Sequence, residues 1–374
     1  MITIKEVKTK SDIKKFVDFP TKLYKGSKVF VHPMRMDEIG LFDKDKNASY
    51  EDCDAIYFLA MDDKKVVGRI AGIIQKAYNI KTEQKRVRFS RFDSIDDVDV
   101  AKALFGAVES WAKESGMTVI HGPMGFNDLD REGMLIDGFE HISTFEEQYN
   151  FEYYPKLVEA CGYQKEVDWL EFKIFKPMKI DERILRLSEK VLERYELKVV
   201  EAKNKSKFIK QYGKEIFEVI DDAYSPLYGT IPLSEKVREQ LIDQFRLFID
   251  LKFMVTVVDK NDRVVAFGFA FPSLSKAMNK SQGKLMPFGI WRLLKALKNP
   301  SVMDLALVGI RQEYQGKGLN AIIMKFMMER MIEYDVDYCE TNLNLEDNIK
   351  IQQQWESFPH EQHKRRRSFV KQIN

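Results

Sequence analysis

The feature that most constrains the fold is an order of elements that occurs twice along the chain. Pairs of apolar, β-branched runs are each separated by a polar turn of four residues, a pattern typical of β-hairpins. These runs span residues 57–60 and 65–74 in the first half, and 253–258 and 263–271 in the second. An internal repeat of this kind predicts two similar halves, each with its own sheet.

The elements after each hairpin also match. A strand, an amphipathic helix, a short strand, a further helix and a terminal strand are predicted in turn. In the first half they span residues 86–93, 100–115, 118–121, 153–161 and 167–175. In the second half they span residues 304–310, 319–334, 336–342, 349–356 and 368–373. Because proline ends a strand, Pro177 favours a boundary between domains 1–177 and 178–374.

Composition narrows the class of protein. The chain has 374 residues, with 60 Lys and Arg against 58 Asp and Glu. This near-neutral balance indicates no global electrostatic field for nucleic acid or for a membrane, and nucleic acid is an unlikely partner. The three widely spaced cysteines predict neither a disulfide framework nor a zinc site. No apolar run approaches the ~18 residues of a membrane span, and no signal peptide is recognised at the N-terminus. We therefore expect a cytoplasmic protein.

The strongest local motif is a buried strand, a loop with two glycines and an apolar helix. The loop holds Gly316, Lys317 and Gly318, and the helix follows at once. Glycine N–H groups approach an anion closely, and a helix N-terminus adds unpaired N–H groups and partial positive charge. The motif therefore suits a pyrophosphate. It matches neither a Walker loop nor a dinucleotide fingerprint, and an ordinary connecting loop stays open as the alternative.

This loop resembles the coenzyme A loop of the GNAT superfamily of N-acetyltransferases. That loop has arginine or glutamine, two residues, glycine, one residue, then glycine or alanine. Gln315 and Gly318 match, whereas Asn320 stands where glycine or alanine is expected. Asparagine is small and caps helices, so the departure is tolerable.

The resemblance implies a fold and a co-substrate. The fold is α/β (α+β), with two GNAT-like domains, each a mixed, mostly antiparallel twisted sheet flanked by helices. The co-substrate is acetyl-CoA or another acyl-CoA, bound without metal by the second domain. The first domain is degenerate, because its matching loop holds Asp93, Asp96, Asp97 and Asp99, whose carboxylates repel a pyrophosphate.

The same resemblance implies the residues that bind the cofactor. Asn348 matches a family asparagine, and Trp355 falls where the family carries a tyrosine that protonates the departing thiolate. Indole is a poor proton donor, so another group protonates the thiolate or the domain binds the cofactor without standard acetyl transfer. The implied cofactor-binding residues are Val308, Ile310, Gln315, Gly316, Lys317, Gly318, Leu319, Asn320, Asn348 and Trp355.

Polar residues on the strand after the loop suggest catalytic roles. In the family the two strands splay apart to admit the thioester. Side chains alternate along a strand, so Glu340, Asn342 and Asn344 are predicted to share one face. Glu340 is the candidate general base, Asn342 is a second candidate, and Asp304 on the neighbouring strand is a weaker one. A solvent-facing edge or a strand end is the alternative reading.

Two loops are candidates for acceptor binding. Tyr224 and Tyr228 follow a helix in the second half, where the family binds acceptors, although an apolar plug is an equal alternative. Asn127 and Arg131 lie in a long loop of the first half. Long ordered loops often carry function, and a structural wrap between domains is the competing interpretation.

Two further segments have open roles. The insertion at residues 283–298 predicts a short amphipathic helix from Pro287, with Trp291, Leu294 and Leu297 on one face. It could close over an acyl chain or touch a membrane, but packing on the core is favoured. The basic run at residues 360–367 could reach the 3′-phosphate of coenzyme A, but a solvated face is favoured.

The sequence as a whole predicts an acyl-CoA-dependent N-acyltransferase. Acetyl transfer to a small-molecule or peptide amine is the leading hypothesis, and homodimer formation is open. One alternative is a non-catalytic acyl-CoA sensor, suggested by Trp355 and Asn320. Another is an aminoacyltransferase of the peptidoglycan-bridge type that uses charged transfer RNA, suggested by the tandem layout and the basic run.

Overall fold

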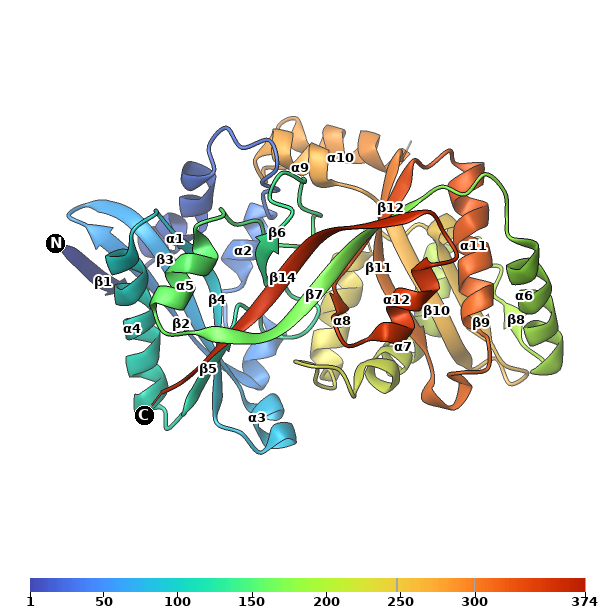
Figure 1. Ribbon diagram of the computed structural model, residues 1–374, viewed down its shortest axis with the longest axis horizontal. Coiled ribbons are helices and arrows are strands. Elements are labelled where there is room, and N and C mark those ends of the chain that lie inside the picture. Colours follow the sequence, from blue (N-terminus) through green and yellow to red (C-terminus); the bar gives the residue numbers. More distant parts are fainter. Residues whose placement is uncertain (247, 299, 374) are drawn as a thin grey trace. The chain divides into compact units, whose positions relative to one another are not determined.

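The computed structural model describes residues 1–246, 248–298 and 300–373. Contacts divide the chain into two compact units (Figure 1). Unit 1 comprises Met1–Leu170, Leu274–Leu293 and His363–Asn374, and unit 2 comprises Glu171–Ser273 and Leu294–Gln362. The units interleave along the chain. The single boundary expected between residues 177 and 178 stays a prediction about the two repeats.

Unit 1 is built on a sheet with the strand order β1-β2-β3-β4-β5-β14, and β6 also pairs with β14. Its pairings are antiparallel except for the parallel pair β4–β5. Its elements are β1 (Ile2–Glu6), α1 (Lys10–Leu23), α2 (Arg35–Gly40), the 3-10 turn η1 (Ala48–Glu51), β2 (Cys53–Asp62), β3 (Lys65–Gln75), α3 (Lys76–Thr82), β4 (Arg86–Ser94), α4 (Val98–Glu114), β5 (Val119–Gly122), β6 (Met134–Asp137), α5 (Tyr154–Ala160) and α9 (Ser275–Ser281).

Unit 2 is built on a sheet with the strand order β7-β12-β11-β10-β9-β8. Here β11 and β12 are parallel, and the other pairings are antiparallel. Its elements are α6 (Glu182–Arg194), β8 (Lys198–Val199), α7 (Lys205–Tyr224), α8 (Glu235–Phe245), η2 (Leu251–Phe253), β9 (Met254–Val258), β10 (Val264–Pro272), β11 (Val302–Ile310), η3 (Gln312–Tyr314), α11 (Asn320–Glu333), β12 (Tyr338–Thr341), β13 (Asn344–Leu345) and α12 (Ile349–Trp355).

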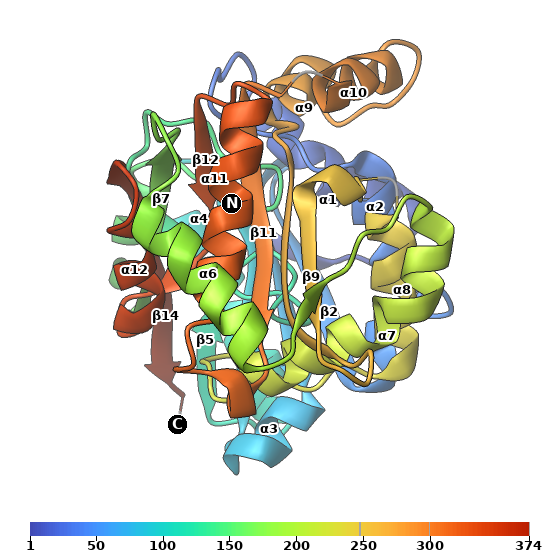
Figure 2. The ribbon, with the colours of Figure 1, turned by 90° about the vertical axis from the view of Figure 1, so that its right-hand side faces the viewer.

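The predicted fold class is confirmed. The strands of each unit are mixed and mainly antiparallel, and helices flank them (Figures 1 and 2). The predicted hairpins are β2–β3 and β9–β10. Figure 2 shows α6 beside α11, and buried Val191 of α6 joins Leu319 and Ile322 in one apolar cluster.

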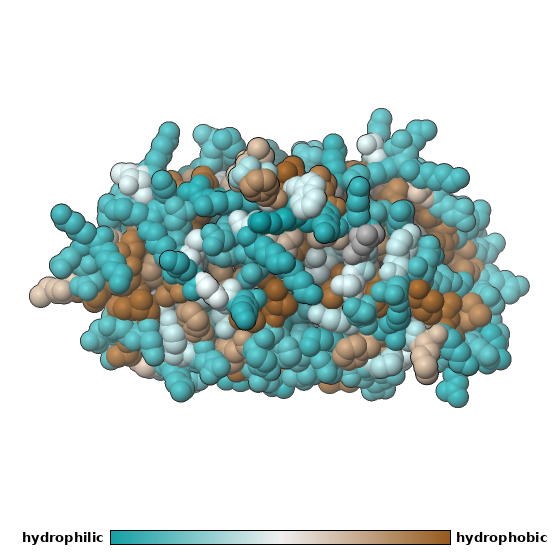
Figure 3. Space-filling model, turned by 90° about the horizontal axis from the view of Figure 1, so that it is seen from above, coloured by the Kyte–Doolittle hydropathy of each residue, from teal (hydrophilic) through white to brown (hydrophobic). Residues whose placement is uncertain are grey.

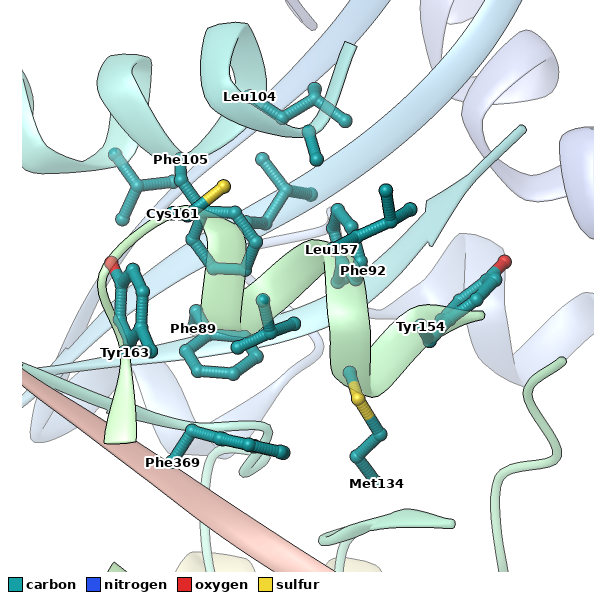
Figure 4. Packing of buried hydrophobic residues seen from close by; sticks show 14 of the residues in the cluster. Phe89, Phe92, Leu104, Phe105, Met134, Tyr154, Leu157, Cys161, Tyr163 and Phe369 are labelled. Carbon is teal, nitrogen blue, oxygen red and sulfur yellow. The ribbon is translucent and has the colours of Figure 1, made fainter. Parts of the chain in front are cut away.

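The terminal strand of each half crosses into the other unit, β7 from Glu171 onward and β14 from His363 onward. Strand β7 (Gln164–Phe175) ends the first half of the chain, but its last residues pair with β12 in unit 2. Strand β14 (His360–Gln372) ends the second half, but it pairs with β5 in unit 1, where Phe369 stands opposite Gly122. Phe369 is fully buried in the unit 1 core, beside residues such as Phe89 (Figure 4). Each sheet therefore needs a strand from the other half.

The basic run is not a solvated face, and the favoured interpretation of it was wrong. Strand β14 begins at His360, eight residues before the predicted strand, and it includes the run. Lys364 and Arg366 are fully buried. The reason is strand alternation, which turns every second basic side chain toward the interior once the run pairs with β6. Arg366 there lies 3.8 Å from the Glu147 carboxylate.

A buried carboxylate balances the other basic side chains of β14. Asp168 of β7 has a fully buried side chain and accepts from Arg367 at 2.8 and 3.0 Å and from Arg365 at 3.2 Å. Burial alone would raise the pKa of Asp168, but the hydrogen bonds from Arg367 and Lys165 hold this pKa below its ordinary 3.8. The ionised form of Asp168 is therefore favoured by folding.

We predict that Asp168→Asn lowers the free energy of unfolding at pH 7 by about 3 kcal/mol, because it leaves two arginines without their counter-charge. A depressed pKa contributes stability above the unfolded value and loses it as the pH falls through the folded value. The difference between variant and wild type should thus hold from neutral pH down to about pH 5 and shrink below pH 4. Urea denaturation followed by tryptophan fluorescence measures it, with exposed Asp45→Asn as the control. Equal stability of Asp168→Asn and wild type at pH 7 would contradict the prediction.

Candidate functional site

Strands β11 and β12 split apart midway along β11. Their parallel pairing runs from Val302 opposite Tyr338 to Leu305 opposite Thr341. Beyond Leu305, β11 continues to Ile310 and pairs with β10. On its other side, no described strand follows it past that point. The splay expected from the resemblance is therefore present in unit 2.

Three side chains donate hydrogen bonds to the backbone carbonyl groups along the open edge of β11. Asn342 donates to the carbonyl of Ala306. Tyr224, the last residue of α7, donates its hydroxyl to the Val308 carbonyl at 3.0 Å. Gln315 donates to the Ile310 carbonyl at 3.2 Å.

All three donors were candidates from sequence, and the structure brings them to one strand edge. In an extended strand the N–H and C=O groups of one residue point the same way. The N–H groups of Val308 and Ile310 therefore also face the split, where no described strand pairs with them.

A β-bulge at Ala306 changes which face each β11 side chain occupies. Phe269 stands opposite Leu307 and Ala270 opposite Leu305, so Ala306 is the extra residue. A bulge of this kind reverses the alternation of faces. Asp304 consequently shares a face with Gly309, whose Cβ position lies 3.0 Å from Val219 of α7.

Unit 1 carries a bulge at the same place in its own sheet. On β3 and β4, Arg69 stands opposite Asp93 and Ala71 opposite Ser90, which leaves an extra residue on β4. The two halves thus share an irregular feature as well as the order of their elements.

Two buried carboxylates lie at the base of the split. Asp304 and Glu340 are direct partners in the β11–β12 pairing, and they are 2 % and 4 % exposed. Register partners on neighbouring strands are about 5 Å apart, so the two acids are adjacent. Lys173 of β7 is the next partner across the sheet, and its ammonium lies 3.0 Å from Glu361.

The expectation that Glu340, Asn342 and Asn344 share one strand face was wrong. Strand β12 ends at Thr341, so the alternation does not extend to the asparagines. Asn342 reaches across to β11, whereas Asn344 is buried in β13 and accepts the indole N–H of Trp355 at 3.0 Å. A solvent-facing edge is also excluded for Glu340, which is buried.

Cys339 lies beside the acids but is a poor nucleophile. Burial, and then the nearby charge of Asp304, raise the pKa of its thiol. Only a thiolate attacks readily, so a covalent acyl-cysteine route is disfavoured at this position.

The glycine loop is open and shaped by its glycines. Gly316 has φ +74°, and no described atom beyond its chain neighbours lies within 4 Å of a Cβ placed there. Gly318 has φ +86°, but its Cβ position lies 3.2 Å from Val191. Both positions favour glycine. Lys317 stands over the rings of Tyr314 and Tyr195, 5.1 and 5.5 Å from their centroids.

The helices after the two matching loops begin differently. Asn320 is the first residue of α11, and its cap position is Leu319, whose side chain cannot accept a hydrogen bond. In unit 1 the cap of α4 is Asp97, whose carboxylate accepts from Asp99 N and Val100 N. An anion would compete with Asp97 at α4, whereas at α11 no side chain takes that place.

Among the remaining candidates of unit 2, Asn348 and Trp355 make structural hydrogen bonds. Asn348 caps α12 by accepting from Ile351 N at 3.4 Å. Trp355 is buried and bonded to Asn344, as described above. Tyr228 is half-buried in the turn after α7.

The two candidates of the first half lie in unit 1, whereas the other candidates belong to unit 2. Asn127 accepts from Leu129 N at 2.9 Å and so shapes its own loop. Arg131 donates to the Phe145 carbonyl at 3.1 Å and lines a polar pocket with Glu38 and Arg91. Burial lowers the pKa of Arg131 below its usual value.

Comparison with known proteins bears on this geometry. No family model matches the chain. The chain is 26 % identical over 374 residues to protein YghO of Escherichia coli (strain K12), covering 97 % of this chain and 94 % of that one. It is 26 % identical over 333 residues to bacterial ceramide synthase of Caulobacter vibrioides (strain NA1000 / CB15N), covering 88 % and 85 %.

Solved structures share the architecture. A tandem GNAT protein from the clavulanic acid biosynthesis pathway superposes with a TM-score of 0.57 at 11 % identity, covering 100 % of this chain and 99 % of that one. This chain is a tandem GNAT-fold protein. A probable N-acyltransferase from Enterococcus faecalis V583 gives a TM-score of 0.51 at 6 % identity, covering 100 % and 73 %. The resemblance to the GNAT superfamily is thereby confirmed for the fold.

Some features of this GNAT fold were not found from sequence. Lys173 was predicted on a strand, but only the pairing of β7 with β12 puts it beside Glu340. Tyr195 follows α6 and is far from the loop in sequence, so no sequence pattern linked it to Lys317. In the part of the chain that the structure describes, no group of three His, Cys, Asp or Glu side chains is arranged to hold a metal ion.

We predict that Trp355→Phe lowers the free energy of unfolding by about 1–2 kcal/mol, because Asn344 loses the donor for its buried amide oxygen. Acyl-CoA affinity should change little, since the indole N–H of Trp355 is already bound to Asn344. Chemical denaturation and calorimetric titration measure the two quantities, with exposed Trp291→Phe as the matched control for stability. A large loss of acyl-CoA affinity without loss of stability would show that Trp355 contacts the ligand instead.

Proposed function

We propose that unit 2 of this tandem GNAT protein transfers an acyl group from acyl-CoA to an amine. The observation that carries the proposal is the split between β11 and β12. It presents the Val308 and Ile310 N–H groups between an open glycine loop and two buried carboxylates. The tandem GNAT fold supports acyltransferase activity in general, and acetyl-CoA, the amine and the residue roles below are our proposals.

The loop and α11 would hold the pyrophosphate of the co-substrate. Gly316 leaves space for close approach, and the N-terminus of α11 has no carboxylate cap. Lys317 adds a cation, and its contacts with Tyr195 and Tyr314 restrict where its side chain can lie. Backbone N–H groups, helix polarity and a cation together favour a phosphate anion. Gln315 would shape the loop through its bond to Ile310.

The open edge of β11 would bind and polarise the thioester. Donors that point at a carbonyl oxygen stabilise the negative charge that develops as the amine attacks. Val308 and Ile310 would supply these N–H groups. Asn342 and Tyr224 keep the intervening carbonyls bonded, so that they do not repel the same oxygen.

Glu340 would accept the proton of the attacking amine, directly or through a water molecule. The amine nitrogen forms a bond to the thioester carbon, the carbon–sulfur bond breaks, and the thiolate departs. Asp304 lies beside Glu340, and the bulge turns Asp304 toward the α7 face. An amine entering along α7, past Tyr224 and Tyr228, would therefore meet the carboxylates from that side.

The thiolate would leave without a proton from Trp355, whose indole N–H is bound to Asn344. An ordinary thiol has a pKa of about 8.5, so a thiolate is a tolerable leaving group near neutral pH. This route differs from the family's tyrosine-assisted step. Because the amine attacks the thioester directly, no covalent intermediate on Cys339 is needed.

Acetyl transfer to a small-molecule or peptide amine is our first choice. The Caulobacter relative is named a ceramide synthase, and ceramide is an N-acylated long-chain amine. Long-chain acyl-CoA and long-chain amines therefore belong in the first screen. The cysteines Cys53, Cys161 and Cys339 are free, which supports our proposal of a reducing, cytoplasmic compartment.

We predict that Gly316→Asp weakens acyl-CoA binding by at least about 10-fold, because the new carboxylate faces the pyrophosphate. Isothermal titration with acetyl-CoA and a longer acyl-CoA measures the affinity. Gly26→Asp is a matched control, because Gly26 also has positive φ and open space around its Cβ position. Gly318→Asp is a poorer probe, since it would also press on Val191. Unchanged affinity in Gly316→Asp would refute the site.

We predict that Glu340→Gln lowers kcat about 100-fold while acyl-CoA affinity stays the same, because glutamine keeps the shape but accepts no proton. Thiol release in an amine screen measures the rate, and Glu356→Gln, at the exposed residue after α12, is the control. A Glu340→Gln enzyme with wild-type kcat would remove Glu340 as the base.

The competing functions give different results in the same assays. Tight acyl-CoA binding without thiol release for any amine would favour the sensor. Salt-dependent binding of charged transfer RNA, with no affinity for acyl-CoA, would favour the aminoacyltransferase.

A further inference from the structure

The insertion between β10 and β11 carries an exposed apolar surface. It holds α9, a turn, and α10 (Gly289–Lys298), which lie at the top of Figure 1. Five apolar side chains in the turn and α10 are 47–74 % exposed, namely Met286, Phe288, Ile290, Trp291 and Leu294. The interpretation that favoured packing on the core was therefore wrong for Trp291 and Leu294.

Hydrogen bonds hold the segment to other parts of unit 1, so the exposed side chains belong to a fixed element. Asn279 of α9 donates to the carbonyls of Ser27 and Phe30 at 3.1 and 2.7 Å. Arg35 N donates to the Gly283 carbonyl at 3.2 Å. Leu293 is buried on the inner side of α10, while Ile290 and Leu294, four residues apart, lie on its outer side. The outer apolar face is therefore not a result of fraying.

The charged residues of the segment itself are all positive. Residues 273–303 contain no Asp or Glu, and their six basic residues are Lys276, Lys280, Lys284, Arg292, Lys295 and Lys298. The whole chain is near neutral, with a formal charge of +2, so the segment is a local exception. Figure 3 views the side that carries α9 and α10, and hydrophobic groups lie there among hydrophilic ones.

We propose that this surface, defined as the turn at residues 284–288 and the outer side of α10, binds an anionic lipid bilayer. An interfacial helix of this kind places apolar and aromatic side chains at the headgroup boundary and lysines beside the anionic headgroups. Trp291 and Phe288 supply the insertion, and Lys284, Lys295 and Lys298 supply the charge. No helix in the described part of the chain is long and apolar enough to cross a membrane, and the proposal places α10 on the surface only.

A second copy of the chain fits this surface less well. A two-fold dimer presents the same patch on both partners. It would set Lys284, Lys295 and Lys298 against their own copies with no acidic residue of the segment to balance them. Like charges across an interface are unfavourable, whereas an anionic bilayer complements all of them.

The test is co-sedimentation of the full chain with vesicles. Vesicles of equal parts phosphatidylcholine and phosphatidylglycerol should bind the protein and shift the tryptophan emission to the blue, and phosphatidylcholine alone should bind far more weakly. The double variant Phe288→Ser, Trp291→Ser should lower the partition coefficient on the order of 10-fold or more. Lys295→Glu with Lys298→Glu should lower it at least about 5-fold for each lysine, and added salt should act in the same direction.

Controls separate the surface from general effects. Lys102→Glu with Lys113→Glu alters exposed charges of α4 by the same amount and should retain vesicle binding. Trp291→Phe should retain binding and lose the emission shift, which shows that residue 291 reports insertion. Circular dichroism checks that each variant is folded.

Three outcomes would overturn the proposal. They are absence of binding to anionic vesicles, binding that survives Phe288→Ser with Trp291→Ser, and a concentration-dependent dimer that this double variant abolishes while vesicles fail to bind. The proposal does not rest on the acyl transfer above. A protein that binds vesicles but no acyl-CoA would support the surface and refute the proposed enzyme.

Discussion

In each unit the strand order is completed by a strand that the other half of the chain supplies, and the candidate site of unit 2 and the core of unit 1 both depend on it. Strand β7 brings Lys173 beside Glu340 in unit 2, and β14 brings Phe369 into the core of unit 1. The basic run of β14 is therefore buried, and Asp168 is needed to balance Arg365 and Arg367. Neither repeat holds a complete sheet without the terminal strand of the other.

The split between β11 and β12 turns this frame into a candidate site. Side chains from three segments donate to the carbonyls of Ala306, Val308 and Ile310. The N–H groups of Val308 and Ile310 point the same way and therefore face the opening. The bulge at Ala306 sets Asp304 on the face of α7, although uninterrupted alternation would have turned it away. One extra residue in a strand thus decides on which side of the sheet the carboxylates lie.

The two repeats keep the same scaffold but differ in electrostatics where the cofactor would bind. At α4 the carboxylate of Asp97 occupies the N-terminus, and Asp93 on β4 is tied to Arg69 at 2.8 Å. At α11 the loop is open, with Lys317 beside it. This contrast is one basis of our proposal that unit 2, and not unit 1, binds acyl-CoA.

The sequence by itself determined the duplicated order of elements, the hairpins, the glycine loop and the GNAT resemblance, because these depend on local periodicity and turn chemistry. Candidate side chains such as Gln315 and Glu340 were found for the same reason. Tertiary structure alone decided the strand exchange, the burial of Lys364 and Arg366, the faces of Asp304 and Asn344, and the exposure of Trp291. Those outcomes depend on which strand pairs with which and on the register of pairing, and local sequence patterns carry no record of contacts between residues far apart in the chain.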